Sequence, residues 1–184
     1  MPYRKLVAGA VALCVVGGGT TAALGANSAG APDRTTIKAV QSIQVKVNRY
    51  IKDNLRWKKD VYFVRSGGTV RIVQRAADDG PHTWSIVKKR DLPSTPKEIF
   101  ECAVCGQIAQ AHGFPEEDGP PAHNFVDDGT GQDTPPEINK AGDSAFFGLE
   151  NGDSVTMKVT APKGKTLWAI CAIHPWMQHK LLVR

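Results

Sequence analysis

Apolar and polar residues alternate over much of the chain after about residue 42. Ile43, Val45 and Val47 alternate with polar residues, which predicts a half-buried strand beginning near residue 42. A helix over residues 36–51 is the competing interpretation, because apolar residues in that range also fit one helical face. We favour the strand.

The same pattern recurs in short segments along the rest of the chain. The further predicted strands are Val61–Val64, Thr69–Val73, Thr83–Val87, Ser144–Leu149, Val155–Val159, Thr166–Cys171 and His179–Val183. Turns rich in Gly, Pro and Asn separate several of them. Short strands spaced in this way are typical of an all-β sandwich, which we place over residues 42–184.

Residues 1–31 have the pattern of a signal peptide. Arg4 and Lys5 precede the apolar run 6–16, and small residues follow it. An uncleaved membrane anchor is the alternative, because a Gly- and Ala-rich continuation extends the apolar stretch over residues 6–25. Both interpretations imply export to a periplasmic, cell-surface or secreted location. Residues 32–41 would then form a linker.

Composition indicates a globular protein, with 41% hydrophobic and 22% charged residues. Charge is unevenly distributed. Residues 34–90 hold 14 Lys or Arg against 4 Asp or Glu, whereas residues 91–153 hold 2 against 13. This pattern indicates either an acidic insertion on a basic body or a charged face that steers a partner. Nucleic-acid binding is disfavoured, because no recognition motif accompanies the basic residues.

The acidic segment at about 91–143 is too long for an ordinary loop. Ser94 or Thr95 before Pro96, with Glu98 close behind, is a helix-start signal. We therefore expect a short helix over about 96–111, followed by an irregular acidic segment rich in Pro and Gly. The insertion would separate two halves of the sandwich.

Metal-ligating side chains concentrate near the C-terminus. Cys171, His174 and Met177 offer a thiol, an imidazole and a thioether within seven residues. A thiolate, imidazoles and a weak axial thioether are the ligands of a mononuclear blue-copper site. His82, at the mouth of a predicted strand, is the best candidate for the second imidazole.

The Cys-x-x-His-x-x-Met loop, preceded by β patterning and an upstream histidine, resembles the cupredoxins and most closely their amicyanin branch. The resemblance covers about residues 42–90 and 144–184 and leaves out 91–143. It implies a Greek-key β-sandwich with one type 1 copper ion, held by His82, Cys171, His174 and Met177. It also implies a monomer that passes single electrons between redox partner proteins.

Further roles follow from the same resemblance. The backbone N–H of Thr83 would point at the Cys171 sulfur and tune the reduction potential. Pro175 and Trp176 would help to form an apolar docking patch around the exposed edge of His174, although a core position for Trp176 is an equal alternative.

The residues around the loop disfavour other copper chemistry. Pro175 leaves no Cys-x-x-x-Cys pair for a binuclear site, and Ile170 and Ala172 stand where a multicopper oxidase places histidines beside its cysteine. We therefore expect an electron carrier and no enzyme. A copper-delivery protein in extracytoplasmic copper homeostasis is the main alternative, and a metal-free receptor or scaffold with this fold is a remote third.

A second group of candidate residues lies in the insertion. Cys102 and Cys105 could form a local disulfide, or bind a second metal together with His112 or His123. A redox-active dithiol is less favoured, because no βαβ pattern surrounds the pair. Outside such a site, we expect His112, His123 and His179 to lie at the surface.

Overall fold

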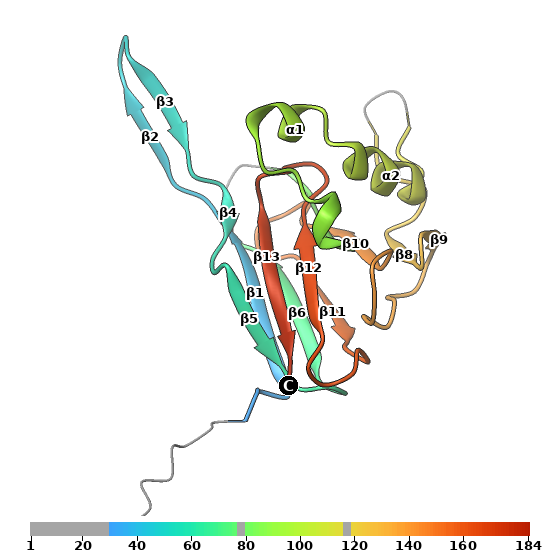
Figure 1. The fold of residues 1–184 in the computed structure, drawn as a ribbon. Helices are drawn as coiled ribbons and strands as arrows, with labels where there is room; N and C mark the ends of the chain where they lie inside the picture. The colour runs from blue at the N-terminus through green and yellow to red at the C-terminus, as the bar shows by residue number, and fades with distance from the viewer. Residues whose placement is uncertain (1–29, 77–79, 116–118) are drawn as a thin grey trace, which may run out of the picture.

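The computed structural model describes residues 30–76, 80–115 and 119–184, and these residues form mainly β-structure (Figure 1). The strands of the first half are β1 (Arg34–Val40), β2 (Ile43–Lys46), β3 (Tyr50–Asp53), β4 (Arg56–Trp57), β5 (Val61–Val64), β6 (Thr69–Gln74) and β7 (His82–Val87). Those of the second half are β8 (Phe125–Asp127), β9 (Thr130–Gln132), β10 (Ser144–Phe147), β11 (Ser154–Lys158), β12 (Thr166–Ile170) and β13 (Gln178–Val183). A 3₁₀ turn at Lys89–Asp91 and the helices α1 (Pro96–Phe100) and α2 (Ala103–His112) lie between β7 and β8.

The strands form two packed sheets. One has the order β11-β6-β1-β4, and the other has the order β5-β13-β12-β7-β10-β8-β9. Their inner faces enclose one apolar core, to which Ile37, Val70, Trp84 and Leu181 contribute fully buried side chains. The prediction of an all-β sandwich with a helical insertion is therefore confirmed.

The first core strand lies where the sequence suggested a linker. Residues 34–40 form β1, which pairs in parallel with β6 and places Thr35, Ile37 and Ala39 on the buried face. Only one of these three residues is strongly apolar, so the alternation was weak in the sequence. The folded domain accordingly begins before residue 42.

The strand predicted from residue 42 exists, but it is not half-buried. β2 pairs only with β3, and every residue of both strands is exposed. The helical alternative over residues 36–51 is wrong, because this stretch belongs to β1, β2 and the start of β3. Figure 1 shows the β2–β3 hairpin as a ribbon that projects beyond the sandwich.

The insertion is more ordered than its composition suggested. Its predicted helix is divided into α1 and α2, and α1 begins with a capping box between Thr95 and Glu98. The acidic segment that we expected to be irregular supplies β8 and β9, and β8 pairs with β10. The insertion therefore extends the larger sheet as well as adding helices.

The predicted leader lies almost wholly outside the described residues, which begin at Gly30. None of the helices in the described ranges is long and apolar enough to cross a membrane. Pro32 and Asp33 are held by backbone hydrogen bonds from Arg65 and Thr69, near the C-terminus and at the end of the molecule away from the hairpin (Figure 1).

Candidate metal centre

The candidate ligands converge because two neighbouring strands end at the same edge. His82 is the first residue of β7, and Cys171 directly follows β12. The two strands pair antiparallel, with Ile170 opposite Ser85. The start of β7 therefore lies beside the end of β12, although 89 positions separate the histidine from the cysteine.

Three donor atoms face one another at this edge. The Cys171 Sγ lies 3.8 Å from the Nδ1 of His82 and 3.6 Å from the Nδ1 of His174. The donor atoms of all three residues lie within 4.8 Å of one another. Two ligands placed 120° apart around a transition-metal ion, at the sulfur and nitrogen distances typical of zinc, would be separated by about 3.8 Å. The spacing therefore fits one ion in a near-trigonal plane.

Burial keeps two of the three donors, His82 and Cys171, uncharged when no cation is present. The side chains of His82 and Cys171 are fully buried. Burial, with a smaller contribution from His174, lowers the pKa of His82 to about 4. Burial also raises the pKa of the Cys171 thiol, although the Thr83 N–H opposes that shift. His82 is consequently a neutral imidazole ready to bind, whereas the thiol requires a bound cation to become a thiolate.

Met177 closes the loop that carries Cys171 and His174. Its backbone N–H donates to the carbonyl of His174, and its own carbonyl accepts from the N–H of Cys171. The indole N–H of Trp57 donates to the same carbonyl at 3.0 Å. The Met177 side chain is fully buried. The loop is therefore fixed by its own backbone and by β4.

Thr83 joins the two ligand-bearing segments. Its backbone N–H donates to Cys171 Sγ at 3.4 Å, as the resemblance implied. Its side-chain oxygen accepts from the backbone N–H of Ala172 at 2.7 Å. Ser85 donates to that same oxygen at 3.2 Å and contacts the Ser144 hydroxyl at 2.6 Å. Hydrogen bonds to a ligating sulfur tune a blue-copper potential, so Thr83 is placed to act on that property.

The hydrogen-bonded series continues into the insertion through His112. Its Nε2 lies 2.8 Å from the Ser144 hydroxyl, and its Nδ1 lies 2.8 Å from the carbonyl of His123. His112 is fully buried, so the expectation that it lies at the surface is wrong. His179 is also buried, and its Nε2 accepts from the Trp84 indole. No sequence pattern indicates that either histidine is buried, because both positions depend on packing between distant segments.

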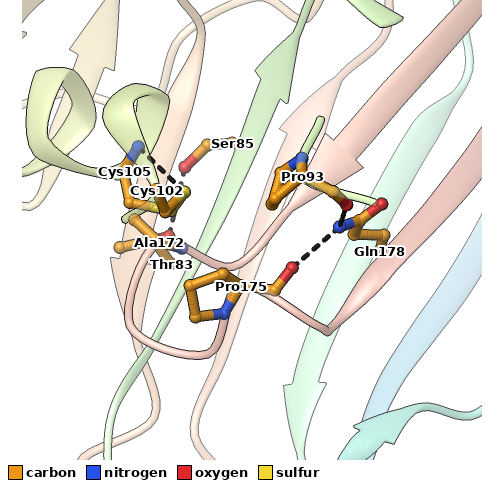
Figure 2. Close-up of a disulfide and its surroundings, with 8 residues drawn as sticks. All are labelled: Thr83, Ser85, Pro93, Cys102, Cys105, Ala172, Pro175 and Gln178. Carbon is orange, nitrogen blue, oxygen red and sulfur yellow. Dashed lines mark hydrogen bonds between the residues drawn. A yellow bond between two sulfur atoms is a disulfide. The ribbon is translucent and has the colours of Figure 1, made fainter. Parts of the chain in front are cut away.

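The insertion packs directly against residues 171–177, which carry Cys171, His174 and Met177 and are called the copper loop below (Figure 2). Cys102 and Cys105 form a disulfide at the start of α2, so neither offers a free thiolate. Cys105 and Ile108 share an apolar cluster with Ile170, and Ala172 packs against it. These contacts cover both chain neighbours of Cys171.

Gln178 ties the insertion to the copper loop a second time. Its side-chain amide donates to the carbonyls of Pro93 and Pro175, each at 2.8 Å (Figure 2). The pair of bonds links the start of the insertion to the segment beside His174. No sequence motif identified Gln178, Ser85 or Ser144 as part of this region.

The structure does not bring the residues of the suggested second metal site together as ligands. The two cysteines are joined to each other, and both His112 ring nitrogens have oxygen partners. His123 is partly exposed and lies 3.5 Å from the Asp133 carboxylate. The insertion therefore has the disulfide that was one of the predicted alternatives.

Two apolar side chains of the copper loop are exposed at the surface of the protein. Trp176 is 51% exposed, and Ile173 is exposed beside it. The Trp176 indole N–H donates to the carbonyl of Leu55 at 3.0 Å, which fixes the ring outside the core. His174 is partly exposed, and its ring lies 5.4 Å from that of Trp176. An apolar surface thus surrounds the outer edge of the site.

A two-sheet sandwich that carries one cysteine and two histidines at one edge is the arrangement that the resemblance to the cupredoxins implied. No protein-family model matches the chain, and no curated protein matches its sequence. Among solved structures, the chain is similar to an auracyanin from Roseiflexus castenholzii, with 17% identity, 84% of this chain and 99% of that chain covered, and a TM-score of 0.42.

Two further solved structures show a comparable similarity. Auracyanin A, described as a "blue" copper protein of Chloroflexus aurantiacus, is 22% identical, with 82% of this chain and 99% of that chain covered and a TM-score of 0.39. A purple cupredoxin from Nitrosopumilus maritimus is 11% identical, with 82% and 99% covered and a TM-score of 0.41. These similarities are distant, so the argument for a metal centre rests on the donor group itself.

Proposed function

We propose that the protein is an electron carrier with one type 1 copper site. Cys171, His82 and His174 would bind the ion in one plane, and Met177 would be the weak axial ligand. The observation that carries this proposal is the spacing of 3.6 and 3.8 Å between the sulfur and the two imidazole nitrogens. Bound copper supplies reversible one-electron chemistry.

The chain's own residues suit such a carrier. Backbone hydrogen bonds hold the Met177 loop closed, and Thr83 holds the two ligand-bearing segments together. A ligand set fixed in this way limits rearrangement when the charge changes. His174 lies closest to the surface and would be the route for electrons, with Trp176 and Pro175 at the contact with a partner.

Copper delivery remains the second candidate function. It would need thiols that exchange copper, and Cys102 and Cys105 are the available pair besides Cys171. Their disulfide argues against this role in the oxidised protein. The buried position of Cys171 also favours retention of the ion over its exchange.

We further propose that the protein acts as an exported monomer and that it exchanges electrons with partner proteins without catalysing a reaction of its own. Residues 1–31 would direct export, as a cleaved leader or as an anchor through residues 6–25. The presence of a disulfide supports an oxidising compartment.

The test is the visible absorption spectrum of the protein loaded with Cu(II). We expect an intense thiolate-to-copper band that disappears in Cys171→Ser and persists in the control Cys102→Ala/Cys105→Ala. A weakly absorbing wild-type protein would contradict the proposal. Tight Cu(I) binding that depends on Cys102 and Cys105 would instead support delivery.

A further inference from the structure

The β2–β3 hairpin has no packing partner within the described residues. Its strands form a separate two-stranded sheet, and all eight of their residues are exposed. Figure 1 shows the hairpin standing clear of both sheets. An isolated two-stranded hairpin is marginally stable in water. Its exposed side chains therefore contribute little to the fold and are available to another molecule.

The two faces of the hairpin differ in chemistry. Val45 lies opposite Ile51 in the antiparallel register, and Ile43 lies two residues from Val45 on the same face. Val45 is 65% exposed and Ile51 is 75% exposed. The other face carries Lys46 opposite Tyr50 and Gln44 opposite Lys52. One face therefore carries three aliphatic side chains, with Asp53 opposite Ile43 at the base, and the other is basic with an aromatic side chain.

None of the residues that the structure describes neutralises the positive charge of the hairpin through an ion pair. Lys46, Arg49 and Lys52 take part in none of the ion pairs formed by the described residues. The single acidic residue of the hairpin is Asp53, whose carboxylate accepts from the side-chain amide of Gln41. The hairpin consequently presents two cations on one face and a third, Arg49, at its turn, with the aliphatic side chains on the other face.

The base of the hairpin is bonded to the candidate copper loop. The N–H of Asn54 donates to the carbonyl of Ser42 and closes the hairpin. The next residue, Leu55, accepts the indole N–H of Trp176 at 3.0 Å. The exposed surface of the hairpin thus begins beside the half-exposed tryptophan that borders His174.

We propose that the β2–β3 hairpin is a docking arm for a redox partner protein whose contact surface is acidic around an apolar patch. This inference rests on the proposed electron-transfer function. Charge complementarity selects such a partner, because the three unpaired cations attract an acidic surface over distance and the aliphatic face then packs against its apolar centre. A second copy of this chain is disfavoured as the occupant, because it would bring together two hairpins that each carry a net positive charge.

The test measures electron transfer into the oxidised copper protein from two reduced cytochromes of similar size and potential, one acidic and one basic. One electron passes from the ferrous haem to Cu(II), so the haem is oxidised and the copper is reduced. We expect the acidic cytochrome to react faster, with a rate constant that falls as salt is added.

Two charge-reversal variants separate the arm from overall charge. Lys46→Glu/Lys52→Glu should lower the rate with the acidic cytochrome by about tenfold or more at low ionic strength and raise it with the basic one. The control Lys163→Glu/Lys165→Glu changes the net charge equally at exposed positions near the opposite end of the molecule and should change the rate by about twofold or less. Val45→Ser/Ile51→Ser should slow the reaction at high salt as well, where attraction between charges is screened.

Further measurements distinguish a failed arm from a failed copper site. Reduction by hydroquinone, which is small and neutral, should be the same in all variants if the copper site is intact. If the wild type holds no blue copper, calorimetric titration of the metal-free protein with the acidic cytochrome still tests the arm: binding lost in Lys46→Glu/Lys52→Glu supports it.

Three results would overturn the proposal. Equal rates for the two charge-reversal variants would show that the arm does not dock the partner. Self-association that Val45→Ser/Ile51→Ser abolishes would assign the aliphatic face to a second copy. Binding to vesicles of anionic lipid that Lys46→Glu/Lys52→Glu abolishes, without any effect on the cytochrome reaction, would assign the arm to a membrane surface.

Discussion

The insertion and the β2–β3 hairpin are both additions to a two-sheet sandwich, and both reach the candidate copper loop, yet they are built in opposite ways. The insertion contacts the body through the apolar cluster around Cys105 and Ile108, the Gln178 amide and the His112 hydrogen bonds. Among the residues that the structure describes, the hairpin is hydrogen-bonded to the body only near its base. The insertion therefore shapes the surroundings of the site, whereas the side chains of the hairpin are exposed and accessible to another molecule.

Truncating one isoleucine in each region should produce the largest difference in stability between the insertion and the hairpin. Ile108 is 9% exposed and packs beside the disulfide, whereas Ile51 on the hairpin is 75% exposed. We expect Ile108→Ala to lower the free energy of unfolding by about 2–3 kcal/mol, because it leaves a cavity against Ile170. Ile51→Ala should change it by about 0.5 kcal/mol or less.

Urea unfolding of the metal-free protein measures both variants under the same conditions. Equal losses of stability would mean that the hairpin packs on the body in solution or that the insertion does not. Either result would remove the contrast between the two regions.

A smaller effect is expected from the hydrogen-bonded series that joins the insertion to Thr83. Ser144→Ala removes the hydroxyl that contacts His112 Nε2 and leaves that buried nitrogen without its partner. The expected loss is about 1–3 kcal/mol. Ser154→Ala is the matched control. Ser154 is exposed and its hydroxyl accepts from the Arg71 guanidinium, so its loss should cost about 0.5 kcal/mol or less.

Thermal and urea unfolding report this pair of variants. The series would be judged unimportant for the fold if Ser144→Ala were no more costly than Ser154→Ala. Retention of the visible copper band in Ser144→Ala would show that the ligands themselves are unaffected.

The smallest effect concerns pH. Burial lowers the pKa of His112 from its ordinary value of 6.5, despite the opposing hydrogen bond to the His123 carbonyl. The unfolded chain therefore binds the proton first as the pH falls below about 6.5, and the folded state loses stability from there down to the lowered pKa. His112→Gln cannot titrate, so its stability should fall less steeply between pH 8 and pH 5.

Urea midpoints of the metal-free wild type and His112→Gln over this pH range test the prediction. Burial also lowers the pKa of His82 and His179, but these residues are present in both proteins, so the difference between the two curves isolates His112. Parallel curves would contradict the assigned role of burial.

The sequence was most informative where the deciding contacts are local. The bounds of the strand Val61–Val64 follow from a short apolar run that ends before a Ser-Gly-Gly turn, and the donor atoms of Cys171 and His174 come from one short loop. His82 could be added because the start of a strand brings it to the same edge. These features need little knowledge of the rest of the chain.

The predictions of burial were wrong where the alternation of apolar and polar residues does not show whether another element packs on the apolar face of a strand. Ile43 and Val45 have the pattern of a core strand, but no other element packs on them. Conversely, β1 buries Thr35 and Ala39, whose types give a weak apolar signal. The burial of His112 and the amide bonds of Gln178 depend on contacts between the insertion and the loop, which no spacing within one segment encodes.

Two tryptophans exchange hydrogen bonds between the hairpin's base and the copper loop. Trp57 donates to the carbonyl of Met177, and Trp176 donates to the carbonyl of Leu55. These reciprocal bonds lie on the body side of the hydrogen bond between Asn54 and Ser42 that closes the hairpin. Residues added or removed in cross-strand pairs beyond this closure would therefore lengthen or shorten the hairpin without shifting the candidate metal-binding loop.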